Sequence, residues 1–535
     1  MGYRLNVATW AEPWQRWLAL RQGWLLPGAA LAVTTLIYIP TLNDYFFADD
    51  FPDLADIATK GVGQYLWDAF LVESSSFYWR FLTRVLLLVE YRLFGLNPAP
   101  YHAVNLALHL AIVLLVYYWA QDLTGKKAPA FLAALFFGVA PTYAGSGGGD
   151  GGAVAWITAV NRLLATLFFL VSLFLLQRYL KGGRADHSYP THPGQVSHAV
   201  GWPSRRLAAA SLGAFLLAIL SDEAVAAFMP ILALYAWLFY YWPRRDVRGF
   251  LLLMAPFAIF ALLALSSLYY VQSGRPYLET TDYKLGWHVA RNFWIYLGRF
   301  AFPFRAGSPW WDSWWLIHRV GGVLLGVLGL YFLVRGPRQA RFLVLWFPVA
   351  LLPFLPWVPW TPSRYTYVAA IPFFLGLALL AWWAHERASR LSLRWATLGG
   401  AALVAVALVI ASALTVRSNN GFAVRALGYQ VLVRELQQGL SSVPTQSRVY
   451  IIGGPWTHKY DNRVWLPTIA ETLYGRKVFL KNLDQVDCAQ LVAPQQGVME
   501  AGWPLFAVFR YRNGDLELTT LESLGCPARA TSRGP

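Results

Sequence analysis

The chain has 535 residues, of which 57% are hydrophobic and only 13% are charged, and its formal net charge is +16. A soluble globular domain would carry about 25% charged residues, so this composition excludes an ordinary soluble protein. Apolar runs long enough to cross a bilayer recur along most of the chain. The sequence therefore predicts a polytopic α-helical membrane protein.

The apolar runs predict about eleven transmembrane helices, because one crossing needs ~20 apolar residues. They lie near 24–42, 102–119, 129–140, 153–176, 207–220, 224–241, 249–271, 320–334, 342–355, 367–384 and 395–416. Clusters of Arg and Lys, for example 178–184 and 244–248, occur in every second connection. By the positive-inside rule these connections are cytoplasmic, so we expect the N-terminal segment 1–23 to be cytoplasmic as well.

Two long connections, about 43–101 and 272–318, are expected on the outer side of the membrane. The first is acidic and includes an amphipathic helix at 80–94. The second is rich in Trp, which favours the membrane–water interface. Both are therefore expected to lie at the membrane surface.

The final segment, 417–535, is predicted to form a small extracytoplasmic α/β domain. Its expected elements are helices at 421–440 and 462–474 and strands at 448–452, 477–481, 506–511 and 516–521, the last two joined by the hairpin signal Asn513-Gly514-Asp515. The chain's two cysteines, Cys488 and Cys526, either form an extracytoplasmic disulfide or remain free thiols. No N-x-S/T sequon occurs, which favours a bacterial plasma membrane over a eukaryotic secretory compartment.

Two adjacent aspartates, Asp49 and Asp50, follow the first predicted span directly. Neighbouring carboxylates at a membrane boundary repel each other and resist desolvation. Their placement favours a task such as holding a metal, pairing with a cation or abstracting a proton. The alternative is an ordinary solvated loop.

His102, Asn105 and His109 share one face of a predicted helix, at spacings i, i+3 and i+7. Polar groups near the start of a span face protein or a water-filled cavity rather than lipid. Both interhelical hydrogen bonds and contact with a substrate agree with this pattern. A zinc site is not expected, because no further ligand follows at short spacing.

Other polar residues are expected on the outer side of the membrane. They are Asp150 in a glycine-rich loop, Glu223, Arg291, Arg299, Arg364 and Tyr365. The glycine-rich loop lacks the Lys-Ser/Thr pair of a phosphate loop, so we interpret it as a flexible connection. Arg364 suits either a lipid phosphate or a simple interfacial anchor.

Several segments together resemble a known superfamily. They are Asp49-Asp50, Arg80-Phe81-Leu82-Thr83-Arg84, Gly95-Leu96-Asn97-Pro98, Tyr101-His102, Asn105, His109, Trp156-Ile157, Ser221-Asp222-Glu223, Tyr296-Leu297-Gly298-Arg299 and Ser363-Arg364-Tyr365-Thr366-Tyr367. This order is similar to that of the GT-C glycosyltransferases, and within them to the protein O-mannosyltransferase-related branch with its TMTC-like proteins. The resemblance covers about 24–416 and implies a GT-C-like transmembrane domain.

The resemblance also implies an activity, an inverting transfer of a sugar from a polyprenyl-phosphate-linked donor to an acceptor hydroxyl on the outer face of the membrane. Asp49 or Asp50 would be the general base. The other implied roles are donor-phosphate binding by Arg364, Arg299 and Arg291, and substrate contact by His102, Asn105, Asp150, Glu223 and Tyr365. The superfamily includes both metal-dependent and metal-independent members, so use of a divalent metal stays open. The acceptor is a protein, a lipid or a glycan, and no nucleic-acid partner is expected.

The chain departs from the TMTC-like pattern at three places. Val160 and Arg162 stand where an Arg and an Asp are usual, and Asp222 stands where a Lys is usual. These departures motivate an alternative, a non-catalytic membrane scaffold or binding subunit of the same fold. A transporter is disfavoured, because ionisable residues gather at the outer edge and no pair of broken spans repeats between the two halves.

Overall fold

The computed structural model describes residues 11–71, 79–145, 152–185, 204–273, 284–302, 311–358, 361–391, 394–439, 443–454, 465–488, 491, 505–512 and 515–526. The chain divides into two compact units. The first unit comprises Met1–Leu42, Ala103–Ala155 and Ala159–Phe422, and the second comprises Asn43–His102, Trp156–Thr158 and Ala423–Pro535. The second unit thus combines the first long connection with the C-terminal segment.

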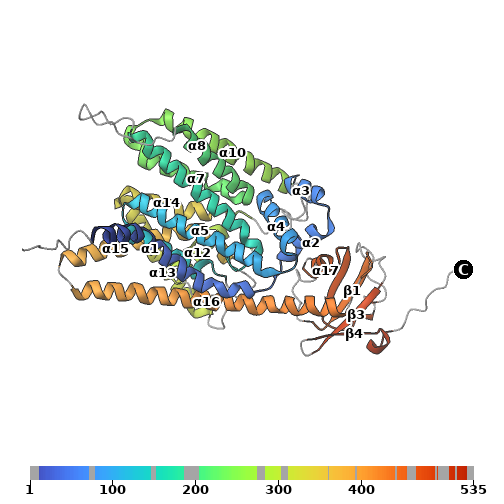
Figure 1. The fold of residues 1–535 in the computed structure, drawn as a ribbon. Coiled ribbons are helices and arrows are strands. Elements are labelled where there is room, and N and C mark those ends of the chain that lie inside the picture. The colour runs from blue at the N-terminus through green and yellow to red at the C-terminus, as the bar shows by residue number, and fades with distance from the viewer. Residues whose placement is uncertain are drawn as a thin grey trace, which may run out of the picture. The chain divides into compact units, whose positions relative to one another are not determined.

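The first unit is built from long helices (Figure 1). They are α1 (Ala11–Tyr38), α5 (Pro98–Thr124), α6 (Lys127–Gly138), α7 (Val160–Ala185), α8 (Ser204–Ser221), α9 (Met229–Ala236), α10 (Val247–Ser273), α12 (Trp287–Ala301), α13 (Trp311–Arg335), α14 (Arg338–Leu351), α15 (Tyr367–Arg390) and most of α16 (Arg394–Gly439). The predicted spans overlap these helices, but those at 129–140, 207–220 and 342–355 do not match a helix that is long and apolar enough to cross a membrane. Among the described residues, eight helices are long and apolar enough to cross a membrane, so the polytopic α-helical class is confirmed.

Helix pairs in this unit pack along their lengths, notably α7 with α8, α12 with α13 and α6 with α15. Short distorted turns adjoin several long helices, and two of them carry Glu223, Arg364 and Tyr365. The turns are the 3-10 helices η3 (Pro141–Tyr143), η5 (Glu223–Phe228), η7 (Trp242–Arg244) and η9 (Ser363–Thr366) and the π-helix η6 (Trp237–Tyr241).

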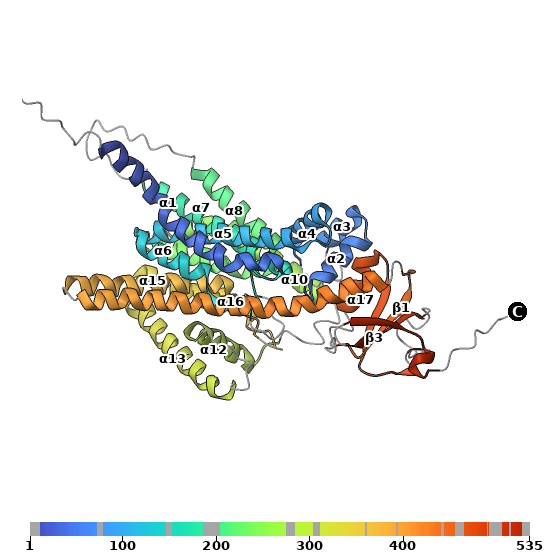
Figure 2. The same cartoon turned by 60° about the horizontal axis from the view of Figure 1, so that its bottom comes forward.

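The second unit contains helices α2 (Asp50–Thr59), α3 (Val62–Leu71), α4 (Phe81–Phe94) and α17 (Leu466–Tyr474) and a four-stranded sheet. The strands are β1 (Ser447–Ile452), β2 (Val478–Leu483), β3 (Leu505–Arg512) and β4 (Asp515–Thr519), in the order β2-β1-β3-β4. β1 runs parallel to β2 and β3, whereas β3 and β4 are antiparallel. α17 packs against both β2 and α2, and Figure 2 shows it beside α2. The predicted strands are confirmed, and the hairpin turn 513–514 lies outside the described residues.

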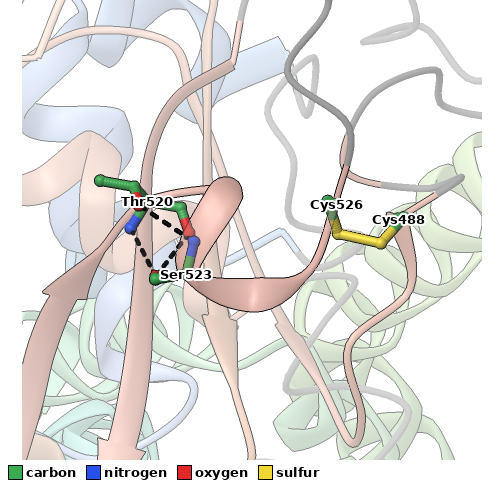
Figure 3. Close-up of a disulfide and its surroundings, with 4 residues drawn as sticks. All are labelled: Cys488, Thr520, Ser523 and Cys526. Atoms are coloured by element: carbon green, nitrogen blue, oxygen red, sulfur yellow. Dashed lines mark hydrogen bonds between the residues drawn. A yellow bond between two sulfur atoms is a disulfide. The ribbon is translucent and has the colours of Figure 1, made fainter.

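Cys488 and Cys526 form a disulfide, with their Cα atoms 5.3 Å apart (Figure 3). Buried Cys526 packs with Tyr450, Ile452 and Val508 of the sheet. Of the two alternatives left open by the sequence, the structure has the disulfide rather than two free thiols. The bridge connects the end of the chain to the segment that follows β2.

The predicted helix at 421–440 is not a separate element, because it continues the last span as the single helix α16. The junction at 417–421 contains no Pro, and a single glycine in a helix costs only about 1 kcal/mol relative to alanine. Gly421 therefore does not end the helix.

Candidate functional site

Asp50 is the first residue of α2, and its carboxylate is fully engaged. Its Oδ2 accepts the Phe47 backbone N–H at 2.7 Å, and its Oδ1 accepts the Thr158 N–H at 2.9 Å. The side chain is buried, and this burial raises its pKa to about 7, although the two backbone hydrogen bonds oppose the shift. Asp50 therefore fastens the start of α2 to the segment Trp156–Thr158 and does not belong to a solvated loop.

The turn before α2 is strained. Ala48 is buried and has a φ of 48°, in the left-handed region that few residues other than glycine adopt. Backbone conformations of this kind cost about 1–3 kcal/mol and concentrate at functional sites. The turn separates the two aspartates into different environments, because Asp50 is buried and Asp49 is exposed.

Asp49 accepts a hydrogen bond from Nε1 of Trp465 at 2.9 Å, through its Oδ1. Trp465 immediately precedes α17, whose Thr472 hydroxyl donates to the Phe51 carbonyl at 3.3 Å. The C-terminal segment therefore orients one oxygen of an exposed carboxylate. No sequence signal could find Trp465, because it lies 416 positions from Asp49.

Three further acids of this segment are paired with cations. Arg84 of α4 lies 3.7 Å from Asp53, and Lys60 lies 3.4 Å from Asp56 and 2.9 Å from Asp68. Burial raises the pKa of Asp53, and the Arg84 guanidinium opposes that shift. The acidic character seen in the sequence is thus largely neutralised inside the fold.

Two further buried acids were missed by the sequence analysis, which singled out acids at span ends. Burial raises the pKa of Asp44 to about 7 and that of Glu90 on α4 to about 8. Within the described residues, one carboxylate oxygen of each has no hydrogen-bond partner. His102 contacts the backbone of Asp44, because its Nε2 lies 3.1 Å from the Asp44 carbonyl oxygen. Spacing alone could not reveal this burial.

Asn105 and His109 are buried in the first unit and make hydrogen bonds between segments. Asn105 donates to the Val154 carbonyl at 3.3 Å. The two ring nitrogens of His109 lie 2.6 Å from the Tyr367 hydroxyl and 3.1 Å from the Gly138 carbonyl oxygen. Of the two readings left open by the sequence, these contacts match interhelical hydrogen bonding.

Arg162 on α7 and Asp222 before η5 form a buried ion pair with an N–O distance of 2.6 Å. Asn161 donates to the same Asp222 oxygen at 2.9 Å. The Arg162 guanidinium also lies over two rings, 4.3 Å from the centroid of Phe354 and 5.0 Å from that of Tyr365. Two departures from the TMTC-like pattern therefore meet in one neutral pair, beside the buried Glu223.

Of the three arginines predicted to bind phosphate, Arg299 and Arg364 approach the same segment. Arg299 on α12 donates to the Thr361 carbonyl and, at 2.7 Å, to the Thr361 hydroxyl. Arg364 belongs to η9, and its guanidinium lies 5.2 Å from the ring centroid of Tyr365. Arg291 is exposed about two helical turns earlier on α12. The predicted substrate residue Asp150 lies outside the described residues.

A metal site was left open by the sequence. Across the part of the chain that the structure describes, no three His, Cys, Asp or Glu side chains are grouped so that they could hold a metal ion. The acids around α2 instead face backbone N–H groups, an indole and basic side chains.

No protein-family model matches the chain. Over 98 residues, 18% of this chain and 10% of the relative, it is 36% identical to Protein O-mannosyl-transferase TMTC1 of Mus musculus. The human protein of the same name is 34% identical over 98 residues. The match thus spans about a tenth of the length of these relatives.

Among solved structures, the archaeal oligosaccharyltransferase AglB from Archaeoglobus fulgidus, in complex with an inhibitory peptide and a dolichol-phosphate, is similar with a TM-score of 0.50. The likeness covers 87% of this chain and 65% of AglB at 11% identity. The chain has a GT-C fold. The matches to the O-mannosyl-transferases agree, over these 98 residues, with the resemblance noted in the sequence. ArnT from Cupriavidus metallidurans, bound to undecaprenyl phosphate, is similar over 91% of this chain at 15% identity, with a TM-score of 0.44.

Proposed function

We propose that this GT-C protein is a membrane glycosyltransferase that moves a sugar from a polyprenyl-phosphate-linked donor to an acceptor hydroxyl, with inversion at the anomeric carbon. The GT-C fold and the local match to O-mannosyl-transferases support this proposal. The complex of AglB with a dolichol-phosphate fits a lipid-linked donor. The reaction would take place on the outer face of the membrane, with the N-terminus in the cytoplasm.

The disulfide in the C-terminal segment supports this topology. A stable disulfide such as Cys488–Cys526 persists in oxidising compartments and is rare in the cytosol. We therefore place 417–535 outside the cytoplasm. We further propose that the transmembrane domain lies in a bacterial plasma membrane. The boundaries 24–416 for the transmembrane domain and 43–101 and 272–318 for the outer connections belong to the same proposal.

The observation that carries the proposal is the different environment of the two adjacent aspartates. A general base must reach the proton that it removes. Asp49 is exposed and uses one oxygen to accept the Trp465 indole N–H, whereas both oxygens of buried Asp50 accept backbone N–H groups. We therefore assign the role of general base to Asp49, and we propose that Asp50 holds the start of α2 in place.

In the proposed reaction, Asp49 removes the proton of the acceptor hydroxyl as its oxygen attacks the anomeric carbon. The bond between that carbon and the phosphate oxygen breaks, and the polyprenyl phosphate leaves with the electron pair. Arg299 and Arg364, which approach the segment 361–365, would stabilise the negative charge on the departing phosphate. Arg291, His102, Asn105, Asp150, Glu223 and Tyr365 remain proposed donor or substrate contacts.

The test compares Asp49→Asn and Asp50→Asn in purified protein supplied with a panel of radiolabelled polyprenyl-phosphate sugars and membrane acceptors. Asp49→Asn should reduce turnover by about 10²–10⁴-fold, the usual worth of a general base, with an unchanged melting temperature. Asp50→Asn should mainly lower the melting temperature. The new amide nitrogen would face one of the two backbone N–H donors, and that donor would lose its hydrogen-bond acceptor.

Trp465→Phe is the matched control for orientation, since it removes the indole N–H and keeps an aromatic ring. It should lower kcat less than Asp49→Asn does. Full turnover by Asp49→Asn would refute the assignment of the base. Donor binding by the wild type without turnover of any sugar in the panel would favour the non-catalytic scaffold.

A further inference from the structure

A small cavity lies between α5, α7, α9, η6 and α14, and its lining includes none of the residues assigned to glycosyl transfer. Its volume is about 190 Å³. Its polar lining consists mainly of Asp122, Gln177, Lys181 and Gln339, and its aromatic lining of Tyr235, Phe239 and Tyr240. Pockets for drug-sized ligands measure about 300–1,000 Å³, so this cavity suits a smaller group.

The cavity lies where three candidate membrane spans end together. Those spans are Pro98–Thr124, Ile157–Gly182 and Glu223–Arg244, and the lining residues lie in the final turns of each. Basic side chains at such ends mark the level of the lipid headgroups. The cavity is therefore at a membrane boundary, which the proposed topology makes the cytoplasmic one.

Gln177 is the most unusual residue of the lining. Its side chain is completely buried, and within the described residues neither its Oε1 nor its Nε2 has a hydrogen-bond partner. An amide buried without partners costs about 1–3 kcal/mol, so buried polar groups are normally satisfied by protein, water or ligand. The cavity therefore presents an unsatisfied donor and an unsatisfied acceptor to whatever enters it.

The helix that provides the aromatic wall is distorted at this point. α9 passes into the π-helix Trp237–Tyr241, which carries Phe239 and Tyr240. π-Helical turns are rare and occur frequently at functional sites. This distortion is independent of the unpartnered amide, and it points to the same place.

The charges of the cavity are ordered from the interior to the mouth. Deepest are the neutral Gln177 and the Asp122 side chain, which is 19% exposed. Lys181 of the lining, 2.9 Å from Asp122, is 42% exposed. Arg178 is not a lining residue, but it lies 3.7 Å from Asp122 beside the cavity and is 54% exposed. A ligand that complements this order of charges has N–H donors at the end that enters the cavity and a phosphate near the cavity mouth.

We propose that this cavity binds the headgroup of a phospholipid with a primary ammonium, the ethanolamine class. The ammonium donates to Asp122 and to Oε1 of Gln177, the phosphate contacts Lys181 and Arg178, and the acyl chains remain in the bilayer. A choline headgroup has no N–H to donate, and a glycerol headgroup has no positive charge at its tip to pair with the Asp122 carboxylate. This site is independent of the proposed glycosyl transfer.

The test uses the full-length protein in detergent after delipidation, with added ethanolamine, choline or glycerol phospholipids of identical acyl chains. We expect the ethanolamine lipid to raise the melting temperature most, with saturation, because a ligand that binds only the folded state stabilises it. Gln177→Leu removes the amide at similar volume. It should fold at least as well without lipid, and its apparent affinity for the ethanolamine lipid should be at least tenfold weaker.

Asp122→Asn is the second variant and should likewise lose the preference for ethanolamine lipid, whereas Asp246→Asn is the matched control. Asp246 accepts the Gly249 N–H outside the cavity, so its variant should keep the preference. Soluble phosphoethanolamine distinguishes a free headgroup from a membrane lipid, and we expect it to bind much more weakly. Equal shifts with all three lipids, or an unchanged preference in Gln177→Leu, would show that this cavity does not select the headgroup and would overturn the proposal.

Discussion

Asp44 shows how a single buried acid can link the stability of the protein to pH. Burial raises its pKa to about 7, from an ordinary value near 3.8. An acid whose pKa is raised by folding binds its proton more tightly in the folded state. Its contribution to the free energy of unfolding is therefore fully present below about pH 4 and is lost as the pH rises to about 7 and beyond.

We predict that Asp44→Asn raises the melting temperature at pH 8 and that this gain shrinks towards pH 4. The amide has no ionised form, so the variant avoids a cost on the order of a few kcal/mol at high pH. Thermal unfolding of both proteins at a series of pH values measures the difference. Asp484→Asn, at an exposed carboxylate, is the control. A gain that does not depend on pH would contradict the explanation.

Other residues show what a local sequence pattern can predict about a side chain and what it cannot. The spacing of His102, Asn105 and His109 correctly indicated that polar groups face the protein interior. It could not distinguish packing from chemistry, because their hydrogen-bond partners are distant in sequence. Likewise, adjacent aspartates look equivalent in the sequence, and only the strained turn at Ala48 separates their environments.

At the scale of elements, the Arg162–Asp222 ion pair joins α7 to the start of η5. Reversing one charge, as in Arg162→Asp or Asp222→Arg, would bury two like charges together. Breaking a buried pair typically costs about 3–5 kcal/mol, so we predict that either single variant aggregates or unfolds at a much lower temperature.

The double variant with both reversals restores opposite charges and should recover most of the lost stability. It should fall short of the wild type, because Arg162 also lies over the rings of Phe354 and Tyr365. Size-exclusion profiles and melting temperatures of the four proteins form a double-mutant cycle. A double variant no more stable than the single ones would show that the pair does not act as a unit.

At the scale of the whole molecule, the Cys488–Cys526 disulfide closes a loop across 38 positions near the end of the chain. In the loop-entropy model, such a crosslink contributes about 4 kcal/mol by restricting the unfolded state. We predict that replacing both cysteines by serine makes the C-terminal segment unfold at a lower temperature and become more sensitive to protease.

Thermal unfolding and limited proteolysis with and without reductant provide the check. Reductant should bring the wild type to the behaviour of the double serine variant and should leave that variant unchanged. Equal stability of oxidised wild type and variant would mean that the sheet packing alone, around Tyr450, Ile452 and Val508, stabilises this segment.

The sequence by itself determined the polytopic helical class, the approximate positions of most helices and the strands of the C-terminal segment, because hydropathy and residue periodicity are local properties. It also carried enough of the GT-C pattern for the fold to be predicted. Only the tertiary structure decided that Asp49 is exposed and held by Trp465, that Arg162 pairs with Asp222, and that the two cysteines are joined. Each of these contacts joins segments that are far apart in the chain and that come together only when the protein packs.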